Sequence, residues 1–230
     1  MPARDPSPSA VPRTRPAGTA QRVLAAAAEL FAERGLGTTL AVVARHAGVG
    51  VATVYRSFPT KDELIYEVYA DRIRAGEHLA REAAADPDAW AGFVRFFEQS
   101  IGILATDRGL RDLTIGGYTR SLGWARGTRP DRLAGLLREN HRTMGVHLTQ
   151  LVDRAKRAGG LREDFEPTDM MLLSVAVQAT ITFGGTEQPA LHQRALGFIL
   201  DGLRPSRPEA TPLPAPAAAG ADLPQARRRR

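Results

Sequence analysis

The sequence predicts an all-α fold of about nine helices. Apolar residues recur at helical spacing through the middle of the chain, and almost no segment alternates as a half-buried strand would. The 230 residues are 43% hydrophobic, which provides enough apolar surface for a sizeable core. Residues 1–18 and 204–230 differ, because they are rich in Pro and Arg. We therefore expect a helical body between a disordered arm and a disordered tail.

Glycine and threonine mark the ends of the first two helices. An apolar stripe predicts a first helix near residues 20–34, and Gly35 ends it. Thr38 or Thr39 can cap a second helix, because a threonine hydroxyl accepts from a free N–H of the first turn. The second helix ends at Gly48.

Proline and a capping box define the next two helices. A third, short helix is expected near residues 51–57, because the residue before Pro59 is biased away from helix. Thr60 and Glu63 stand at the spacing of a capping box, in which each side chain satisfies a free N–H near the other. The fourth helix begins there and is expected to run to about Ala84.

The second half of the chain contains four longer helices and an irregular or briefly helical stretch over residues 105–127. The longer helices are expected after Pro87, from about 128 to 159, over 167–183 and over 189–203. The helix over 167–183 is apolar on all sides, so it requires burial on all sides. A partner subunit could bury one of these sides.

The formal net charge of +6 comes from the two ends of the chain. Residues 1–18 carry +2, residues 204–230 carry +4, and the residues between balance to zero. The overall charge therefore gives no indication that the helical body binds nucleic acid. A local excess remains, because the stretch from Arg34 to Lys61 holds four basic residues and no acidic one. The run Arg227–Arg230 could add salt-dependent DNA affinity, or it could be a solvated tail.

Several protein classes are excluded by what the sequence lacks. The absence of Cys excludes disulfides, thiolate metal sites and thiol catalysis. There is no apolar signal segment, and the longest uncharged stretch, Met170–Thr186, is too short and polar to span a membrane. We therefore expect a cytoplasmic protein. No catalytic motif or metal-ligand spacing is found, so we expect no enzyme activity, no cofactor and no metal site.

Residues 38–61, TTLAVVARHAGVGVATVYRSFPTK, form a helix-turn-helix pattern. Gly48 and Gly50 relieve the tight turn between the two short helices. Val54 faces inward, and the opposite face of its helix carries side chains that suit a DNA groove, since Arg reads guanine and Thr or Val can contact a thymine methyl. These side chains are Val51, Thr53, Tyr55, Arg56 and Ser57.

The longer string RVLAAAAELFAERGLGTTLAVVARHAGVGVATVYRSFPTKDEL closely resembles the N-terminal domain of the TetR/AcrR family of bacterial transcriptional regulators. The resemblance implies a three-helix DNA-binding domain, a linking fourth helix and a C-terminal domain for ligand binding and dimerisation. It places Thr39 and Lys61 at phosphate-contacting positions. The residues expected to bind DNA are Thr38, Thr39, Val51, Ala52, Thr53, Tyr55, Arg56, Ser57 and Lys61.

Two residues depart from the family pattern. Gly50 stands where Ser is frequent and provides no hydroxyl for a helix cap, and Ser57 stands where His is frequent and has a shorter reach. We expect Tyr55 to contact phosphate. Arg56 could contact a base or a phosphate.

The region from 87 to 203 resembles one subgroup of the same family in the segments FVRFFEQS, DRGLRDL and GGLREDFEPTDMMLL. The resemblance implies that the helices near 167–183 and 189–203 form the dimer interface. It also implies a pocket for a small, largely apolar effector. The candidate pocket residues are Trp90, Phe93, Phe97, Ile101, Leu104, His141, Met144, Leu148, Met171, Gln178 and Phe183.

Some assignments remain open in the sequence. His141 could be a satisfied interior histidine, a polar pocket residue or a zinc ligand, and the candidate pocket residues could be plain core. Tyr118 and Trp124 could gate entry to a pocket or lie on the surface.

These observations predict a ligand-responsive, homodimeric repressor that binds a palindromic operator of double-stranded DNA. The expected domains are an arm over 1–18, a DNA-binding domain over 19–65, a ligand-binding and dimerisation domain over 66–203, and a tail over 204–230. The alternative is a helical dimeric protein-interaction module with a weakened DNA-binding domain.

Overall fold

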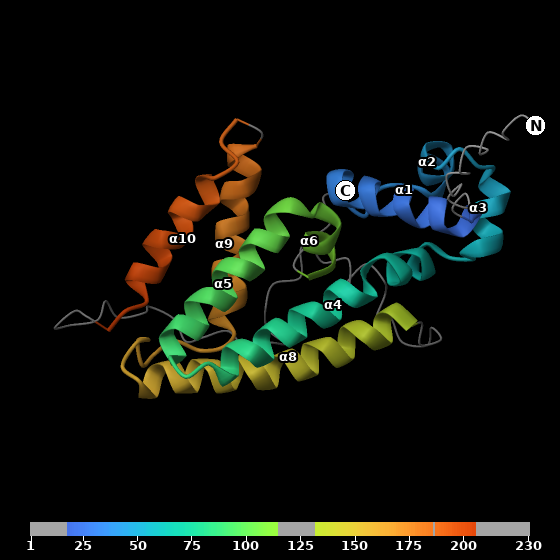
Figure 1. Ribbon diagram of the computed structural model, residues 1–230. Helices are drawn as coiled ribbons and strands as arrows, with labels where there is room; N and C mark the ends of the chain where they lie inside the picture. Colours follow the sequence, from blue (N-terminus) through green and yellow to red (C-terminus); the bar gives the residue numbers. More distant parts are fainter. Residues whose placement is uncertain (1–17, 115–131, 186, 206–230) are drawn as a thin grey trace, which may run out of the picture.

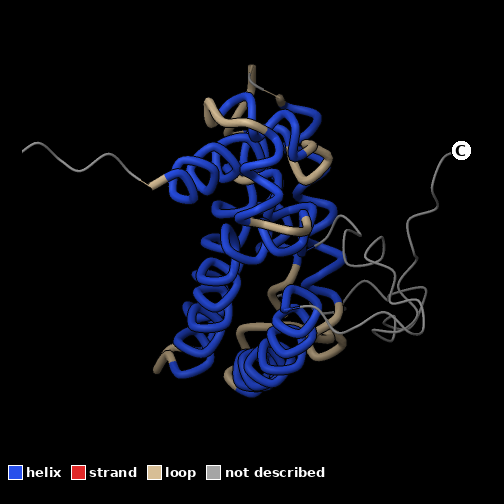
Figure 2. The backbone as a smooth tube through the Cα atoms, turned by 90° about the vertical axis from the view of Figure 1, so that its right-hand side faces the viewer, coloured by secondary structure: helices blue, strands red, loops and turns tan. Residues whose placement is uncertain are grey.

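The computed structural model describes residues 18–114, 132–185 and 187–205, and within these ranges the chain forms nine α-helices and no strand (Figures 1 and 2). The helices are α1 (Thr19–Arg34), α2 (Leu40–His46), α3 (Val51–Ser57), α4 (Lys61–Ala85), α5 (Ala89–Thr106), α6 (Arg108–Thr114), α8 (Arg132–Arg157), α9 (Asp169–Gly184) and α10 (Leu191–Gly202). The predicted all-α fold is confirmed. No described helix combines the length and the apolar character that crossing a membrane requires.

Helices α1, α2 and α3 pack around one apolar cluster together with the start of α4 (Figure 1). Val23, Phe31 and Val54 are fully buried in it, and Phe58 closes it after α3. Small residues on α1 and α2 allow the helices to approach closely, so three short helices bury a shared core.

The same cluster continues beyond the first three helices. It includes Tyr69 of α4, Leu110 and Leu113 of α6, and Leu133 at the start of α8. The domain boundary after residue 65 stays a prediction. The first apolar cluster contains residues from both sides of that position. The position of the N-terminal helices therefore depends on α6 and α8 as well as on α4.

A second apolar cluster joins the far half of α4 to α5, α8, α9 and α10. Its centre is aromatic, since Phe93 stacks on Trp90 and meets Phe97 and Phe165 edge to face. At the corner between α4 and α5, Arg154 of α8 donates to two main-chain carbonyls, those of Ala84 and Asp86. These bonds satisfy carbonyls that the end of α4 leaves without helical partners.

The apolar stripe of α8 differs from the predicted one at its middle. The sequence places His141 within the stripe, and one of its three alternatives is a satisfied interior histidine, but the side chain is exposed. Asn140 takes the inward position instead, and its Oδ1 atom is buried. The reason is the 3.6-residue helical period, which advances the buried face by steps of both three and four residues. An interior role for His141 is therefore wrong.

Several sequence predictions fall outside the described residues. These are the disordered arm, the disordered tail with Arg227–Arg230, and the roles suggested for Tyr118 and Trp124.

Helix α6 packs unusually closely on α1 and α4. A Cβ atom added at Gly109 would lie 2.2 Å from Tyr69 Oη and 3.0 Å from the carbonyl oxygen of Phe31. Only glycine therefore permits this approach without a shift of the helices.

We predict that Gly109→Ala lowers the free energy of unfolding by about 1–3 kcal/mol, because overpacking forces the backbones apart. Gly145→Ala is the matched control. Gly145 is an exposed helical glycine of α8 with open space around its Cβ position. Its replacement by alanine should therefore raise the free energy of unfolding by roughly 0.5–1 kcal/mol. Urea unfolding at one fixed protein concentration measures both. Equal midpoints for the two variants would contradict the close packing of α6.

Candidate nucleic-acid interface

Helices α2 and α3 form the helix-turn-helix that the sequence predicts. Gly48 adopts a positive φ of 66°, which other residues rarely adopt, and the N–H of Val49 donates to the carbonyl of Ala44 at 3.0 Å. Val43, Ala44 and Val54 are fully buried where the two helices meet. The turn and this apolar contact fix the angle at which α3 leaves α2.

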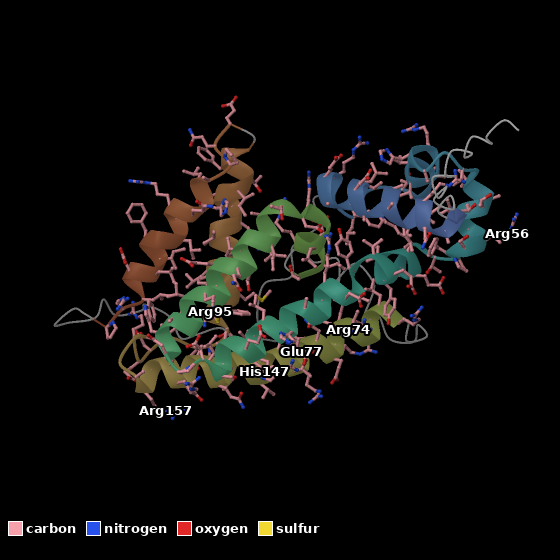
Figure 3. The ribbon with its side chains drawn as sticks, viewed as in Figure 1. Arg56, Arg74, Glu77, Arg95, His147 and Arg157 are labelled. Atoms are coloured by element: carbon pink, nitrogen blue, oxygen red, sulfur yellow. The ribbon has the colours of Figure 1, made fainter. Side chains whose placement is uncertain are left out.

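One face of α3 is free of the protein core. The side chains of Val51 and Tyr55 are 42% and 52% exposed, and Ala52, Arg56 and Ser57 are exposed as well. Thr53 is half-buried. Figure 3 shows Arg56 projecting from α3 away from the rest of the molecule. These residues form one outward surface of a short helix, which is the shape that enters a major groove.

The start of α3 lacks a side-chain cap. Gly50 occupies the N-cap position with extended backbone angles and makes no side-chain hydrogen bond. The N–H of Thr53 instead bonds the carbonyl of Gly50 at 2.9 Å. A serine here would gain a few tenths of a kcal/mol at most, so the departure from the family pattern leaves the helix intact.

The two threonines before α2 have different roles in the structure. Thr39 caps α2, since its Oγ1 accepts from the N–H of Val42 at 3.4 Å, and its side chain remains exposed. Thr38 is half-buried, and its hydroxyl donates to the carbonyl of Gly35 at 3.1 Å. Only Thr39 therefore presents its side chain freely at the surface.

Lys61 points into the protein rather than away from it. Its Nζ donates to the carbonyl of Leu36, in the loop between α1 and α2. Burial lowers the pKa of Lys61, although Asp62 and Asp112 attract its positive charge. The N–H of Leu36 in turn donates to Asp112 Oδ2 at 2.8 Å.

A buried carboxylate fixes the start of α6. Asp107 is 4% exposed and accepts from Tyr69 Oη at 2.8 Å, from the N–H of Leu110 at 2.9 Å and from Arg72. Burial, followed by the nearby charge of Asp107, raises the pKa of Tyr69, so its phenol stays protonated. Asp107 and Asp112 were not singled out from the sequence as functional, and their spacing carries no signal, because their partners lie on other helices.

The exposed cations of this region stand on α1, α2 and α3. Arg34, Arg45 and Arg56 are all exposed, whereas Lys61 is half-buried. His46 is linked to Glu29 of α1 at 2.9 Å. Because no acidic residue lies between Arg34 and Lys61, the loop and the two helices present a surface suited to phosphate.

The predicted pocket residues do not gather around one cavity. Phe93, Phe97 and Ile101 are packed in the second cluster, and Leu104 lies in the first. Trp90 stacks on Phe93, and the guanidinium of Arg204, just after α10, lies 4.7 Å from the centre of the Trp90 ring.

Two of the predicted pocket residues lie on the surface. Phe183, in the last turn of α9, is 86% exposed, and His141 is exposed on α8. Neither side chain is therefore enclosed in a pocket of one subunit.

The remaining pocket candidates are half-buried on α8 and α9. They are Met144, Leu148, Met171 and Gln178. Gln178 Nε2 and Asn140 Oδ1 are buried and have no hydrogen-bond partner among the described residues. Buried polar atoms are nearly always paired in proteins, so these two atoms are suited to a ligand with complementary polar groups.

A groove of about 490 Å³ lies elsewhere, between α4 and α5. None of the predicted pocket residues lines it. Its lining residues are Ala75, His78, Leu79, Glu82, Gln99, Gly102 and Ile103.

Helices α9 and α10 leave an apolar surface uncovered. Leu172 and Val175 of α9 are 43% and 45% exposed, and Phe198 of α10 is 65% exposed. Phe183 extends this surface at the end of α9. Among the described residues, half of the exposed large apolar side chains thus stand on these two helices, and large exposed apolar patches usually mark an interaction surface.

The chain matches two protein-family descriptions. Residues 23–68 match "Bacterial regulatory proteins, tetR family", and residues 86–205 match "Transcriptional regulator SbtR-like, C-terminal domain". The first match covers α2, α3 and the start of α4, and the second covers α5, α6, α8, α9 and α10.

Solved structures of regulators resemble the chain over most of its length. The TetR transcriptional regulator SCO0520 from Streptomyces coelicolor is 28% identical over 82% of this chain and 99% of its own, with a TM-score of 0.52. The TetR transcription regulatory protein from Mycobacterium vanbaalenii is 31% identical over 80% and 93%, with a TM-score of 0.47. The ketosteroid transcriptional regulator KstR2 of Mycobacterium tuberculosis shares the fold at 16% identity over 83% and 97%, with a TM-score of 0.56.

We predict that Arg56→Ala weakens DNA binding by about 1–3 kcal/mol and relaxes the preference at one base pair, if the guanidinium reads a base. If Arg56 contacts phosphate, binding to all sequences should weaken alike, and the salt dependence should fall by about one unit. Competition binding with randomised duplexes distinguishes the two cases.

Arg81→Ala is the control for this variant. Arg81 is an exposed arginine on the far half of α4, so its removal changes the net charge equally without touching α3. An Arg56 variant that binds every duplex as the control does would contradict a role in recognition.

Proposed function

The chain belongs to the TetR family of DNA-binding transcriptional regulators, and on this premise we propose that it is a homodimeric repressor released from its operator by a small, largely apolar effector. The observation that carries the proposal is the outward face of α3, where Val51, Tyr55 and Arg56 stand clear of the core. Each subunit inserts this face into the major groove of one half-site.

The DNA contacts divide by chemistry. Arg56, Val51 and Thr53 are suited to base edges in the groove, because a guanidinium, a methyl group and a hydroxyl each recognise different bases. Tyr55 and Ser57 carry hydroxyls suited to phosphate oxygens. Thr39 and Ala52, which are exposed, complete the proposed surface, and Thr38 lies at its edge with its hydroxyl bonded to the carbonyl of Gly35.

The proposed dimer forms through α9 and α10. Their uncovered apolar side chains require a partner, and a second copy of the chain offers the same surface to itself under two-fold symmetry. Two recognition helices related by that symmetry read the two halves of a palindrome.

The proposed effector binds in the C-terminal helices. The support is the half-buried side chains on each of α8 and α9, and the buried amide atom that each helix carries without a partner among the described residues, on Asn140 and on Gln178. A ligand shifts the equilibrium only if it binds the DNA-free state more tightly than the DNA-bound state.

Selection of bound duplexes from a random pool, at about 0.15 M salt to suppress non-specific phosphate binding, tests the proposed function. Enrichment of a palindrome would support it. Compounds of low polarity can then be screened for release of that duplex. A dimer that enriches no sequence would contradict the proposal and favour a protein-interaction module.

We predict that Phe198→Glu converts the dimer to a monomer, because it places a carboxylate in an apolar interface. Sedimentation equilibrium should then give the 24.8 kDa of one chain instead of twice that mass. Val146→Glu is the control, since Val146 is 51% exposed on α8, outside the proposed interface. A Phe198 variant that stays dimeric would show that α10 is not part of the interface.

A further inference from the structure

The main chain of Leu36 lies where three segments of the protein meet. Its N–H donates to Asp112 Oδ2 at 2.8 Å, and its carbonyl accepts from Lys61 Nζ. Asp112 belongs to α6, Lys61 is the first residue of α4, and Leu36 lies in the loop between α1 and α2. We call these three residues the Leu36 junction.

The Leu36 junction is closely packed. The side chain of Leu36 is 2% exposed and belongs to the first apolar cluster. Gly35 has a φ of +79°, and a Cβ atom there would lie 2.4 Å from Asp112 Oδ2. Asp112 can therefore reach Leu36 only because the neighbouring residue is glycine. Figure 1 shows α6 beside the end of α1, as this contact requires.

Lys61 is withdrawn from solvent in the Leu36 junction. Its side chain is half-buried, its ammonium bonds a main-chain carbonyl, and burial lowers its pKa. The ammonium has three donors, and the carbonyl of Leu36 takes one of them. The geometry thus gives this cation a partner inside the protein.

The loop that these bonds fix leads directly to the DNA-facing surface. Thr38 and Thr39 follow Leu36 by two and three residues, and the hydroxyl of Thr38 bonds the carbonyl of Gly35. Thr39 caps α2 through Val42. The position of Leu36 therefore sets where α2 begins and where the hydroxyl of Thr39 lies.

We propose that Lys61 and Asp112 are positioning residues for DNA binding, which act by holding the main chain of Leu36 from both sides. Lys61 contributes to DNA affinity by placing Thr39 and α2 through its bond to the carbonyl of Leu36. Asp112, an acidic residue, strengthens binding to a polyanion through the same loop. This inference rests on the DNA-binding function proposed above.

Two substitutions of Lys61 separate positioning from phosphate contact. Lys61→Met keeps most of the stem but has no donor, whereas Lys61→Gln keeps an N–H donor without charge. Positioning predicts that Lys61→Met weakens binding to the selected duplex roughly tenfold, and that Lys61→Gln restores part of this loss because it can still donate to Leu36. A role through phosphate charge alone predicts equal losses in the two variants, each with a salt slope lower by about one unit, and this outcome would overturn the proposal.

Two substitutions of Asp112 provide the opposite test. Simple electrostatics predicts that Asp112→Ala and Asp112→Asn both raise DNA affinity, because each removes a negative charge. Positioning predicts that Asp112→Ala weakens binding, and that Asp112→Asn, whose amide oxygen can still accept from Leu36, stays close to wild type. Asp71→Ala is the matched control, because Asp71 is a fully exposed carboxylate on α4 that pairs only locally with Arg74.

Hydrogen exchange at the amide of Leu36 tests the contact without DNA. The amide should be protected in the wild type and in Asp112→Asn, and it should exchange much faster in Asp112→Ala. Equally fast exchange in the wild type and in Asp112→Ala would overturn the Leu36 junction. A wild type that enriches no duplex would instead overturn the proposed function, whatever the exchange rates are.

Discussion

The arrangement of the helices depends on the buried carboxylate of Asp107. It lies between α5 and α6 and accepts from Tyr69 and Arg72 of α4 and from a first-turn N–H of α6, that of Leu110. Loss of this acceptor would leave the Tyr69 hydroxyl and a helix N–H buried without partners, at about 1–3 kcal/mol each. The short helix α6 thus has a fixed position on α4, and that position places Asp112 beside the loop that precedes α2.

Helix α4 connects the two apolar clusters because it takes part in both. Leu64, Ile65 and Ile73 lie in the cluster of the helix-turn-helix, and Ala80 and Ala83 lie in the cluster of α5, α8, α9 and α10. A helix of 25 residues spans about 37 Å. Its small alanines allow α5 and α8 to pack closely at one end, while larger side chains fill the core at the other. The surface of α3 is therefore held by a stiff element that extends far into the C-terminal helices.

Local features could be read from the sequence, and contacts between distant segments could not. The bounds of α3, the cap at Thr60 and the glycine turn before α3 follow from residues within a few positions of one another. The bond from Leu36 to Asp112 joins residues 76 positions apart. Nothing in the spacing of these residues predicts that bond, because it depends on how α6 packs on α1. The same limit applies to Lys61. The sequence resemblance identifies its position along the chain but does not show that its side chain points inward.

The sequence predicts that the helix over 167–183, which is α9, is buried on all sides, but it does not identify what buries it. Within the described chain, α9 buries Met170 and Val177 but leaves Leu172 and Val175 partly exposed. Exposure of these apolar side chains to water is unfavourable, so the sequence predicts that another surface buries them. That surface must itself be apolar. Phe198 of the neighbouring α10 is exposed as well, and the two-fold dimer proposed above covers these side chains with the same helices of a second copy.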